Sequence, residues 1–458
     1  MPFLLVPLAT DVLLWLLIFA VVAYAWYCRR RAHLAAPWKR VFQAKAAMIC
    51  SVILGCYLLI GLADSLHFRV RLASVEAASG AAYSPEVLSV LDLATWQLRE
   101  RREKSYSAPL ATRLYAKEQI ELPDGKTARE YPRLRFGGAH LADEADWAGD
   151  IVRKIGTGLV IAALAGALVF LGAALLERRH PHVPWRAAGM TLAVMLAVAI
   201  PAALLARGYH VLGTDKVGQD VLYQSLKSMR VSIIIGTLTT LVLLPLGAAL
   251  GVMAGYFKGW VDDAIQYLYT TLNSIPGVLL IAAFVLMLQV VMERNADLFP
   301  TAAHRADVRL LALCAILGLT SWTGLARLLR GEALKLSQLE YIQAAHAFGV
   351  SNVRVLSRHI MPNVAHIIII SLVMDFSGLV LAEAVLSYVG VGVDPATTSF
   401  GTMINAARLE MGREPIVWWS LAAAFGFMFL LVLAANLFAD AVRDGFDPRV
   451  RVGVMVPV

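Results

Sequence analysis

The chain has 458 residues, of which 59% are hydrophobic and only 16% are charged, and its mean hydropathy is +0.66. Soluble domains carry about 45–50% apolar and about 25% charged residues, so this balance excludes an ordinary soluble globular protein. The formal net charge of +8 reflects 41 Lys and Arg against 33 Asp and Glu. The basic residues gather in short segments between apolar runs, which indicates charge retained on the cytoplasmic side of a membrane rather than nucleic-acid binding.

Nine apolar stretches are long enough, or nearly so, to cross a bilayer core of about 30 Å. The sequence therefore predicts an all-α polytopic membrane protein with about nine transmembrane helices. The predicted spans are Asp11–Tyr27, Ala46–Ala63, Ile155–Leu176, Ala187–Ala206, Val231–Phe257, Ala264–Met292, Leu310–Leu328, Asn363–Val389 and Ile416–Ala439.

The charge of the short loops predicts the orientation of these spans. Basic loops favour the cytoplasmic side, and basic residues follow the first, third and seventh spans. They are Arg29, Arg30, Arg31, Lys39, Arg40 and Lys45, then Arg178, Arg179 and Arg186, then Arg330, Lys335, Arg354 and Arg358. An odd number of spans then places the N-terminus outside and the C-terminus inside. The first span is predicted to be a retained helix, because no small-residue cleavage site precedes Cys28.

Residues 64–150 would lie outside the cytoplasm and are predicted to form a small mixed module. Pro85 to Arg102 favours a helix capped by Ser84, and 118–133 favours a β-hairpin around Pro123, Asp124 and Gly125. Two roles remain open for this module. It is a spacer or packing cap, or it contacts a substrate-carrying partner.

The predicted cytoplasmic loop from Gly331 to Asn363 has a regular pattern. Glu340 to Phe348 contains good helix formers and stops at Gly349, a residue suited to a left-handed C-cap. Ser351 then begins a second amphipathic turn that runs up to Pro362. The prediction is a short helix, a glycine turn and another helix at the membrane face.

This segment resembles the docking motif of inner-membrane permeases of ABC importers, specifically the second permease of the dipeptide and oligopeptide class. The family motif has Glu-Ala-Ala, a glycine four residues after the second alanine, and a proline thirteen residues further on. This chain has Gln343, Ala344, Ala345, Gly349 and Pro362 at matching positions, with Gln343 where glutamate is usual. The resemblance implies that these residues, together with Glu340, dock an ATPase subunit.

Further matches follow in the family's order from about Ala187 to Arg449. One departure is Gln219, where the family usually has arginine. The matching segments are Gly213–Leu222, Ala254–Asp262, Ser274–Pro276, Arg358–Asn363, Leu386–Gly392, Asn436–Asp440 and Arg443–Arg449.

The resemblance also implies a domain organisation. An ABC importer type I permease core would occupy residues 187–449, with the cytoplasmic docking loop at 330–363. Before it lie a pair of transmembrane helices at 1–63, the outer module at 64–150, and a third helix with its cytoplasmic loop at 151–186. A tail at 450–458 completes the chain.

By the same resemblance, the chain is expected to be the permease subunit of an ATP-driven importer in the bacterial inner membrane, and not an enzyme. Its expected partners are a homologous second permease, two ATPase subunits, an extracytoplasmic solute-binding protein and membrane lipid. ATP and Mg²⁺ would be used by the ATPase subunits, and no cofactor by this chain. The Gly125-Lys126-Thr127 sequence is not a phosphate loop, because Ile120 stands where that loop requires glycine.

Alternatives come from other functional classes. An ion-coupled secondary transporter would not need the docking segment, and a membrane sensor would need a cytoplasmic output domain. The substrate also stays open, since relatives of this class carry peptides, modified peptides, nickel complexes and glutathione-like molecules.

Two carboxylates lie inside the eighth predicted span. A charged carboxylate at the centre of a transmembrane helix costs at least about 2.5 kcal/mol, so Asp375 and Glu383 should face protein or water. They line the translocation path, or they pair with a neighbouring helix or are protonated. Pro276 is similarly a gating hinge or a simple kink. No histidine pair has the spacing of a metal site, and none is expected.

Overall fold

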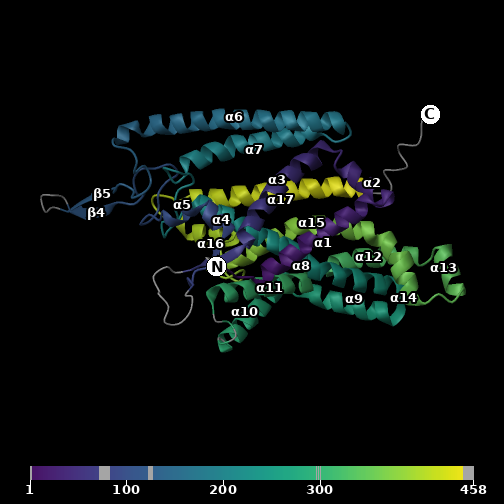
Figure 1. The fold of residues 1–458 in the computed structure, drawn as a ribbon. Coiled ribbons are helices and arrows are strands. Elements are labelled where there is room, and N and C mark those ends of the chain that lie inside the picture. Colours follow the sequence, from purple (N-terminus) through teal and green to yellow (C-terminus); the bar gives the residue numbers. More distant parts are fainter. Residues whose placement is uncertain are drawn as a thin grey trace. The chain divides into compact units, whose positions relative to one another are not determined.

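The computed structural model describes residues 3–71, 83–121, 127–295, 297, 299 and 301–446, with the backbone alone for 32–33, 120–121 and 127–128. Two compact units divide the chain (Figure 1). Unit 1 comprises Met1–Pro7, Phe42–Ser232 and Thr397–Ala434. Unit 2 comprises Leu8–Val41, Ile233–Ala396 and Ala435–Val458. Two long helices, α8 (Val221–Phe257) and α17 (Trp419–Phe446), contribute to both units.

Within the described residues, nine helical segments are long and apolar enough to cross a membrane. Each of the nine predicted spans overlaps one of them, so the polytopic all-α prediction is confirmed. The first, second, fourth and ninth spans differ from prediction only by a few residues at their ends. Larger differences occur in the third, fifth, sixth, seventh and eighth.

The prediction of one continuous sixth span over Ala264–Met292 was wrong. The structure has two helices here, α9 (Gly259–Ser274) and α10 (Gly277–Arg294). Ile275 between them is extended, with φ −93° and ψ 130°. The residue before a proline is pushed out of the helical region, so Pro276 ends α9 although the apolar pattern continues through it. Of these two helices, α10 is the candidate span.

The third and fifth spans begin earlier than the apolar pattern predicts. In α8 the Asp220 carboxylate accepts hydrogen bonds from the backbone N–H groups of Leu222 (2.8 Å) and Tyr223 (3.2 Å), which fixes the helix start ten residues before Val231. The third span is part of α6 (Trp147–Arg179), which follows the 3-10 turn η1 (Glu144–Asp146). Hydropathy alone detects only the apolar middle of such helices.

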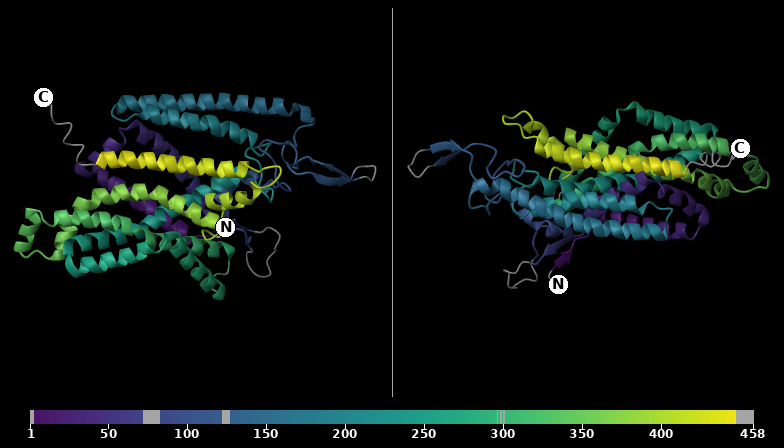
Figure 2. Two further views of the ribbon diagram at one scale, coloured as in Figure 1. Left: turned by 180° about the vertical axis from the view of Figure 1, so that it is seen from behind. Right: turned by 90° about the horizontal axis from the view of Figure 1, so that it is seen from above.

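Unit 1 contains a long helical hairpin, α6 and α7, whose two arms lie side by side in every view (Figures 1 and 2). Small residues allow the close approach. A Cβ on Gly158 would lie 2.7 Å from the Pro201 Cα, so this contact requires glycine. The other elements of unit 1 are β1 (Phe3–Leu5), α3 (Lys45–Ser65), β2 (His67–Val70), β3 (Leu88–Ser89), α4 (Val90–Ala94), α5 (Trp96–Glu100), β4 (Glu118–Glu121), β5 (Thr127–Glu130), α7 (Trp185–Leu205) and α16 (Phe400–Glu410).

The outer module confirms the hairpin prediction and corrects the helix prediction. β4 and β5 pair antiparallel, and the turn at Pro123, Asp124 and Gly125 lies outside the described residues. In place of one helix over Pro85–Arg102 there are β3, α4 and α5. Ser89, not Ser84, caps the first helix, and it forms a reciprocal capping box with Asp92. A three-stranded antiparallel sheet with the strand order β1-β2-β3 joins the chain's start to this module.

Unit 2 packs around α8 and α12. Gly251 on α8 allows this approach, since a Cβ there would lie 2.5 Å from the Ala326 carbonyl oxygen. Asp262 on α9 forms a two-bond ion pair with Arg330 on α12, with both N···O distances 2.6 Å. The other elements of unit 2 are α1 (Ala9–Arg29), α2 (Ala32–Val41), α11 (Ala302–Ser321), α12 (Thr323–Leu336), α13 (Glu340–Ala347), α14 (Asn352–Val355), η3 (Leu356–Ile360) and α15 (Met361–Val389).

The seventh predicted span, Leu310–Leu328, corresponds to parts of two consecutive helices, α11 and α12, which together cover Ala302–Leu336. The Asp307 carboxylate on α11 accepts hydrogen bonds from the backbone N–H groups of Ala9 (2.7 Å) and Thr10 (3.3 Å). It thereby caps the N-terminus of α1, a helix almost 300 residues away in the sequence. This cap explains why an acidic residue lies buried on an apolar helix.

Candidate functional site

The predicted docking segment forms a short helix, a left-handed turn and a second helix. α13 ends in a Schellman motif, in which the Val350 N–H bonds the Ala345 carbonyl (3.0 Å) and the Gly349 N–H bonds the His346 carbonyl (2.9 Å). Gly349 has φ +73°, the conformation that glycine adopts without strain. The helix, the stop at Gly349 and the second helix after Ser351 therefore confirm the predicted local structure.

Apolar anchors hold the segment to the rest of unit 2. Ile342 on α13, Val355 on α14 and Ile360 in η3 are each 0% exposed. They belong to one core cluster with Tyr256 of α8 and Leu329 of α12. Since the anchors are side chains of the docking segment itself, a force applied to α13 reaches the membrane helices directly.

A polar contact adds to this anchoring. The Tyr256 hydroxyl donates to the Asn352 Oδ1 (2.9 Å) and lies 2.9 Å from the His346 Nε2, so it joins α8 to both α13 and α14. Sequence reasoning missed Tyr256 and Asn352, because about 90 residues separate the partners. The signal in the sequence was only that Tyr256 falls within one of the family-like segments.

The outward face of α13 combines small alanines with polar side chains. Glu340, Gln343, Ala344 and Gly349 are exposed, and Ala345 is half-buried. The Gln343 side-chain amide donates to the Gln338 carbonyl (3.1 Å), within the segment. Two large apolar side chains flank the glycine turn and were not singled out from the sequence: Phe348 is 86% exposed and Val353 76% exposed. Exposed apolar residues of this size at a turn are typical of a protein-binding surface.

The second helix continues past Pro362, which corrects the predicted break there. α14, η3 and α15 form one helical segment from Asn352 to Val389. The wider π-type turn of η3, Leu356–Ile360, directly precedes Pro362, which lies in the first turn of α15. A proline has no N–H to donate, and the wider turn accommodates that missing bond without ending the helix. Asn363 also bonds the Tyr341 hydroxyl of α13 (3.0 Å).

The two carboxylates of α15 have different surroundings. Glu383 is 1% exposed, and its Oε1 accepts a hydrogen bond from the Ser387 hydroxyl (2.7 Å). The Ser387 oxygen in turn accepts from the Val393 N–H (3.3 Å) in the loop after the helix. Asp375 is only half-buried, and no hydrogen bond or ion pair joins it to another described residue. Glu383 is thus held within the protein, whereas Asp375 is partly accessible.

Pro276, the third path candidate, is exposed and lies between α9 and α10. It stands at a change of helix, rather than within one helix, so it is better placed to separate two rigid elements than to kink one. Of the residues predicted to dock an ATPase subunit, the structure places all but Pro362 on α13 or at Gly349, and it places the three path candidates elsewhere in unit 2.

A buried charge cluster holds the outer module to one of the family-like segments. His210 Nδ1 lies 2.8 Å from Asp220 Oδ2, and its Nε2 lies 3.4 Å from Glu103 Oε1. Burial lowers the pKa of His210, but its bonds with these two carboxylates outweigh burial and raise that pKa to about 9. Burial likewise opposes ionisation of Glu103, whereas His210 and three backbone N–H groups lower the pKa of Glu103 to about 2. The cluster is therefore charged at neutral pH.

The nine apolar helical segments found among the described residues define a class, namely a multi-pass membrane protein. Comparison with known proteins extends this conclusion. Residues 247–452 match the family model described as binding-protein-dependent transport system inner membrane component.

Several curated relatives cover about half of the chain. It is 32% identical over 242 residues to the oligopeptide transport system permease protein OppC of Mycobacterium tuberculosis, covering 53% of this chain and 77% of that one. It is 33% identical over 244 residues to the glutathione transport system permease protein GsiD of Pectobacterium atrosepticum, covering 53% and 73%. The dipeptide transport system permease protein DppC of Lactococcus lactis is 28% identical over 240 residues, covering 52% and 64%.

The chain belongs to the family of binding-protein-dependent transport system inner membrane components. It is a multi-pass permease subunit of an ABC importer and not an enzyme, as the sequence predicted. In such importers the permease works with separate subunits, and ATP hydrolysis is not a task of this chain.

Proposed function

We propose that this permease imports peptides or peptide-like solutes and forms the translocation path together with a homologous second permease. The single observation that carries the proposal is the α13–Gly349–α14 segment, which joins an exposed small-residue face to fully buried anchors. One of the two expected ATPase subunits, which use ATP and Mg²⁺, would dock there. Closure of those subunits would then bias the inward-open and outward-open states of the path.

The docking contacts would centre on Glu340, Gln343, Ala344, Ala345 and Gly349. Pro362 has a different role in this proposal, since it lies at the start of α15 and sets the wide turn below the docking helix. Phe348 and Val353 join the docking surface because of their exposure. Both would enter an apolar groove on the ATPase subunit.

We also propose an orientation in the bacterial inner membrane with the N-terminus outside and the C-terminus inside. The basic short loops support it. The same orientation places residues 64–150 outside, where a solute-binding protein would deliver substrate. Hydrogen bonds between the module and the segment after α7 support a packing role for it: the Ser107 N–H donates to the Thr214 hydroxyl (2.7 Å), and the Glu103 N–H donates to the Gly218 carbonyl (2.9 Å).

For the path itself, Asp375 and Glu383 remain candidates to line it, and Pro276 a candidate for gating. Partial exposure inside a transmembrane helix supports Asp375. The link from Glu383 through Ser387 to the Val393 N–H supports a role for Glu383 in fixing the outer end of α15. The proposed core for these roles is residues 187–449, with the flanking divisions as predicted.

The substrate class rests on the printed names of the relatives, which are permeases of oligopeptide, dipeptide and glutathione transport systems. The test is uptake of a labelled dipeptide into proteoliposomes that contain this chain, its second permease and its ATPase subunits, with the binding protein outside. Uptake that requires internal ATP is expected. Uptake driven by an ion gradient without ATP would instead favour a secondary transporter.

A further inference from the structure

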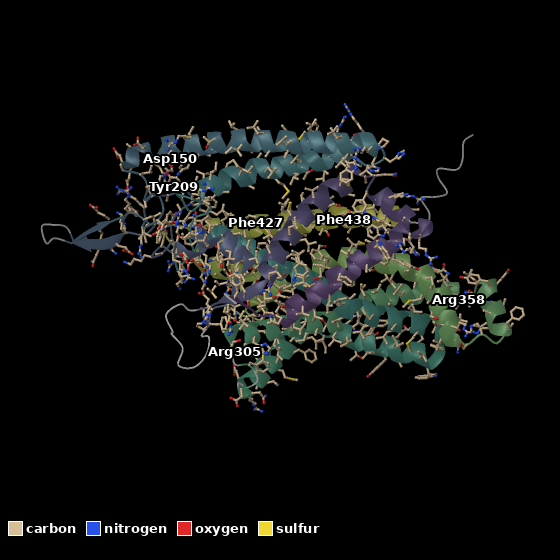
Figure 3. All side chains as sticks on the ribbon, in the orientation of Figure 1. Asp150, Tyr209, Arg305, Arg358, Phe427 and Phe438 are labelled. Atoms are coloured by element: carbon tan, nitrogen blue, oxygen red, sulfur yellow. The ribbon has the colours of Figure 1, made fainter. Side chains whose placement is uncertain are left out.

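Unit 2 also contains a group of charged side chains away from the docking segment. A cavity of about 330 Å³ opens between α10, α11 and the loop after α15. Its volume falls at the lower end of the range for ligand pockets, about 300–1,000 Å³. Arg305, which lines it, and Arg358, which lies in η3 of the docking segment, mark opposite ends of unit 2 (Figure 3).

The cavity has an apolar floor and a charged rim. Val285 and Met292 of α10 are buried in the floor. They stand seven residues apart, and the other α10 residues of the lining, Leu288 and Gln289, fall on the same helical face. Across the cavity, α11 presents charged side chains four residues apart in the sequence. The charged lining comprises Arg305, Arg309, Glu293 and Asp394.

The two arginines have no carboxylate partner. Neither Arg305 nor Arg309 forms an ion pair with any described residue, although both share the cavity with acidic groups. The Arg309 Nε is buried and has no hydrogen-bond acceptor within the described part of the chain. A buried charged N–H without an acceptor is unfavourable, so this atom is suited to receive a ligand oxygen. Asp307, between the arginines, is already occupied as the cap of α1.

The two carboxylates of the lining each have an oxygen that accepts no hydrogen bond from a described residue. Glu293 Oε1 accepts a bond from the Gln289 side chain (3.2 Å), and Asp394 Oδ1 accepts one from the Ala396 N–H (2.9 Å). The other oxygen of each carboxylate accepts no bond from a described residue. The cavity thus offers guanidinium donors and carboxylate acceptors that are too far apart to satisfy each other.

We propose that this cavity binds the charged ends of a short zwitterionic peptide. Arg309 and Arg305 would receive the terminal carboxylate, since guanidinium groups bind carboxylates through paired hydrogen bonds. Glu293 and Asp394 would receive the terminal ammonium, and the floor at Val285 and Met292 would take a small apolar side chain. This inference rests on the proposed peptide-import function and adds a specificity site in the permease itself.

The test is equilibrium binding of tritiated Ala-Ala to the assembled transporter in lipid nanodiscs, without the binding protein, so that the selectivity of that protein does not contribute. Saturable binding is expected for the wild type. Arg309→Gln should weaken it about tenfold or more, and Arg309→Lys less, because lysine keeps the charge but not the paired donors. Arg294→Gln is the matched control, an exposed arginine at the end of α10 outside the cavity lining.

Blocked peptides test the assignment of each end. Ala-Ala amide should displace tritiated Ala-Ala from the wild type about tenfold more weakly than unlabelled Ala-Ala does. On the Arg309→Gln variant the two peptides should displace it equally. On the Glu293→Gln/Asp394→Asn double variant, N-acetyl-Ala-Ala and Ala-Ala should displace tritiated Ala-Ala equally.

Three results would overturn the proposal: no saturable binding, unchanged binding in Arg309→Gln at normal assembly, or loss of binding when phosphatidylglycerol replaces phosphatidylcholine. The last would assign the arginines to lipid headgroups. Peptide uptake by the complete system with no binding here would reject this site while leaving the proposed function intact. Absence of uptake by the complete system would reject the proposed function.

Discussion

At the residue scale, the buried charges of this membrane protein are used to join distant parts of the chain. Asp307 caps α1, Asp262 binds Arg330, and His210 lies between two carboxylates. Breaking a buried ion pair by removing one partner costs about 3–5 kcal/mol, so the contacts of His210 in particular fix a local geometry strongly.

The His210 cluster makes stability depend on pH. The pKa of His210 rises from its ordinary 6.5 to about 9 in the folded protein, so its contribution is complete below about pH 6.5 and is lost as the pH rises through about 9. We expect the thermal unfolding midpoint of the purified protein to fall between pH 7 and pH 9.5. At pH 6.5 the His210→Gln variant should have a lower midpoint than the wild type. Between pH 7 and pH 9.5 its midpoint should change much less than that of the wild type. A wild-type midpoint that stays constant up to pH 9.5 would contradict the charged cluster.

Glu383 provides a test of the path proposal. Glu383→Gln keeps the side-chain shape and an acceptor for the Ser387 hydroxyl but removes the charge. If Glu383 lines the path, peptide uptake should fall about tenfold while membrane abundance stays normal. Ser387→Ala is the control, because it removes the same hydrogen bond and keeps the carboxylate. Reduced abundance with proportionate uptake would instead indicate a structural role.

At the element scale, the left-handed turn at Gly349 sets the angle at which α13 leaves the core. A Cβ added at Gly349 would meet nothing within 4 Å, so any effect of a substitution comes from the backbone conformation alone. An L-residue pays about 1–2 kcal/mol in this conformation, and a β-branched one is worst. The turn is thus a specific target for separating docking from folding.

We expect Gly349→Val to insert into the membrane normally while uncoupling ATP hydrolysis from transport. The measured quantity is peptide taken up per ATP hydrolysed in proteoliposomes, which should fall several-fold. Gly349→Asn is the matched control, because asparagine tolerates the left-handed region and should retain most coupling. Unchanged coupling in Gly349→Val would show that the turn is not required for transmission.

The cap between Asp307 and α1 predicts a second element-level effect. Asp307→Ala removes the acceptor of the Ala9 and Thr10 N–H groups, at a cost of about 1 kcal/mol. Hydrogen exchange at residues 9–12 should therefore increase about fivefold. Asp307→Asn, which keeps one acceptor, should increase it less. Equal exchange in all three proteins would mean that the cap does not hold α1.

At the scale of the whole molecule, the sequence predicted the spans and one glycine turn, but not every break or long-range contact. Apolar length located all nine spans, and Gly349 after a run of alanines located the docking turn. The break at Ile275 was missed because hydropathy does not register the restriction that Pro276 places on its neighbour. The Tyr256 bridge and the His210 cluster were missed because their partners lie about 90 and 107 residues away, and spacing alone does not reveal such contacts.

The central claim is that this chain is an importer permease moved by ATPase subunits through α13. Its most direct test is site-specific crosslinking in native membranes. Gln343→Cys, on the exposed face of α13, should form a crosslink to an ATPase subunit, and the yield should change when ATP is added. Glu130→Cys, exposed on the β4–β5 hairpin, should form none and should react with an impermeant reagent from outside. A Gln343→Cys protein that forms no crosslink to an ATPase subunit, or that reacts from outside, would contradict the account.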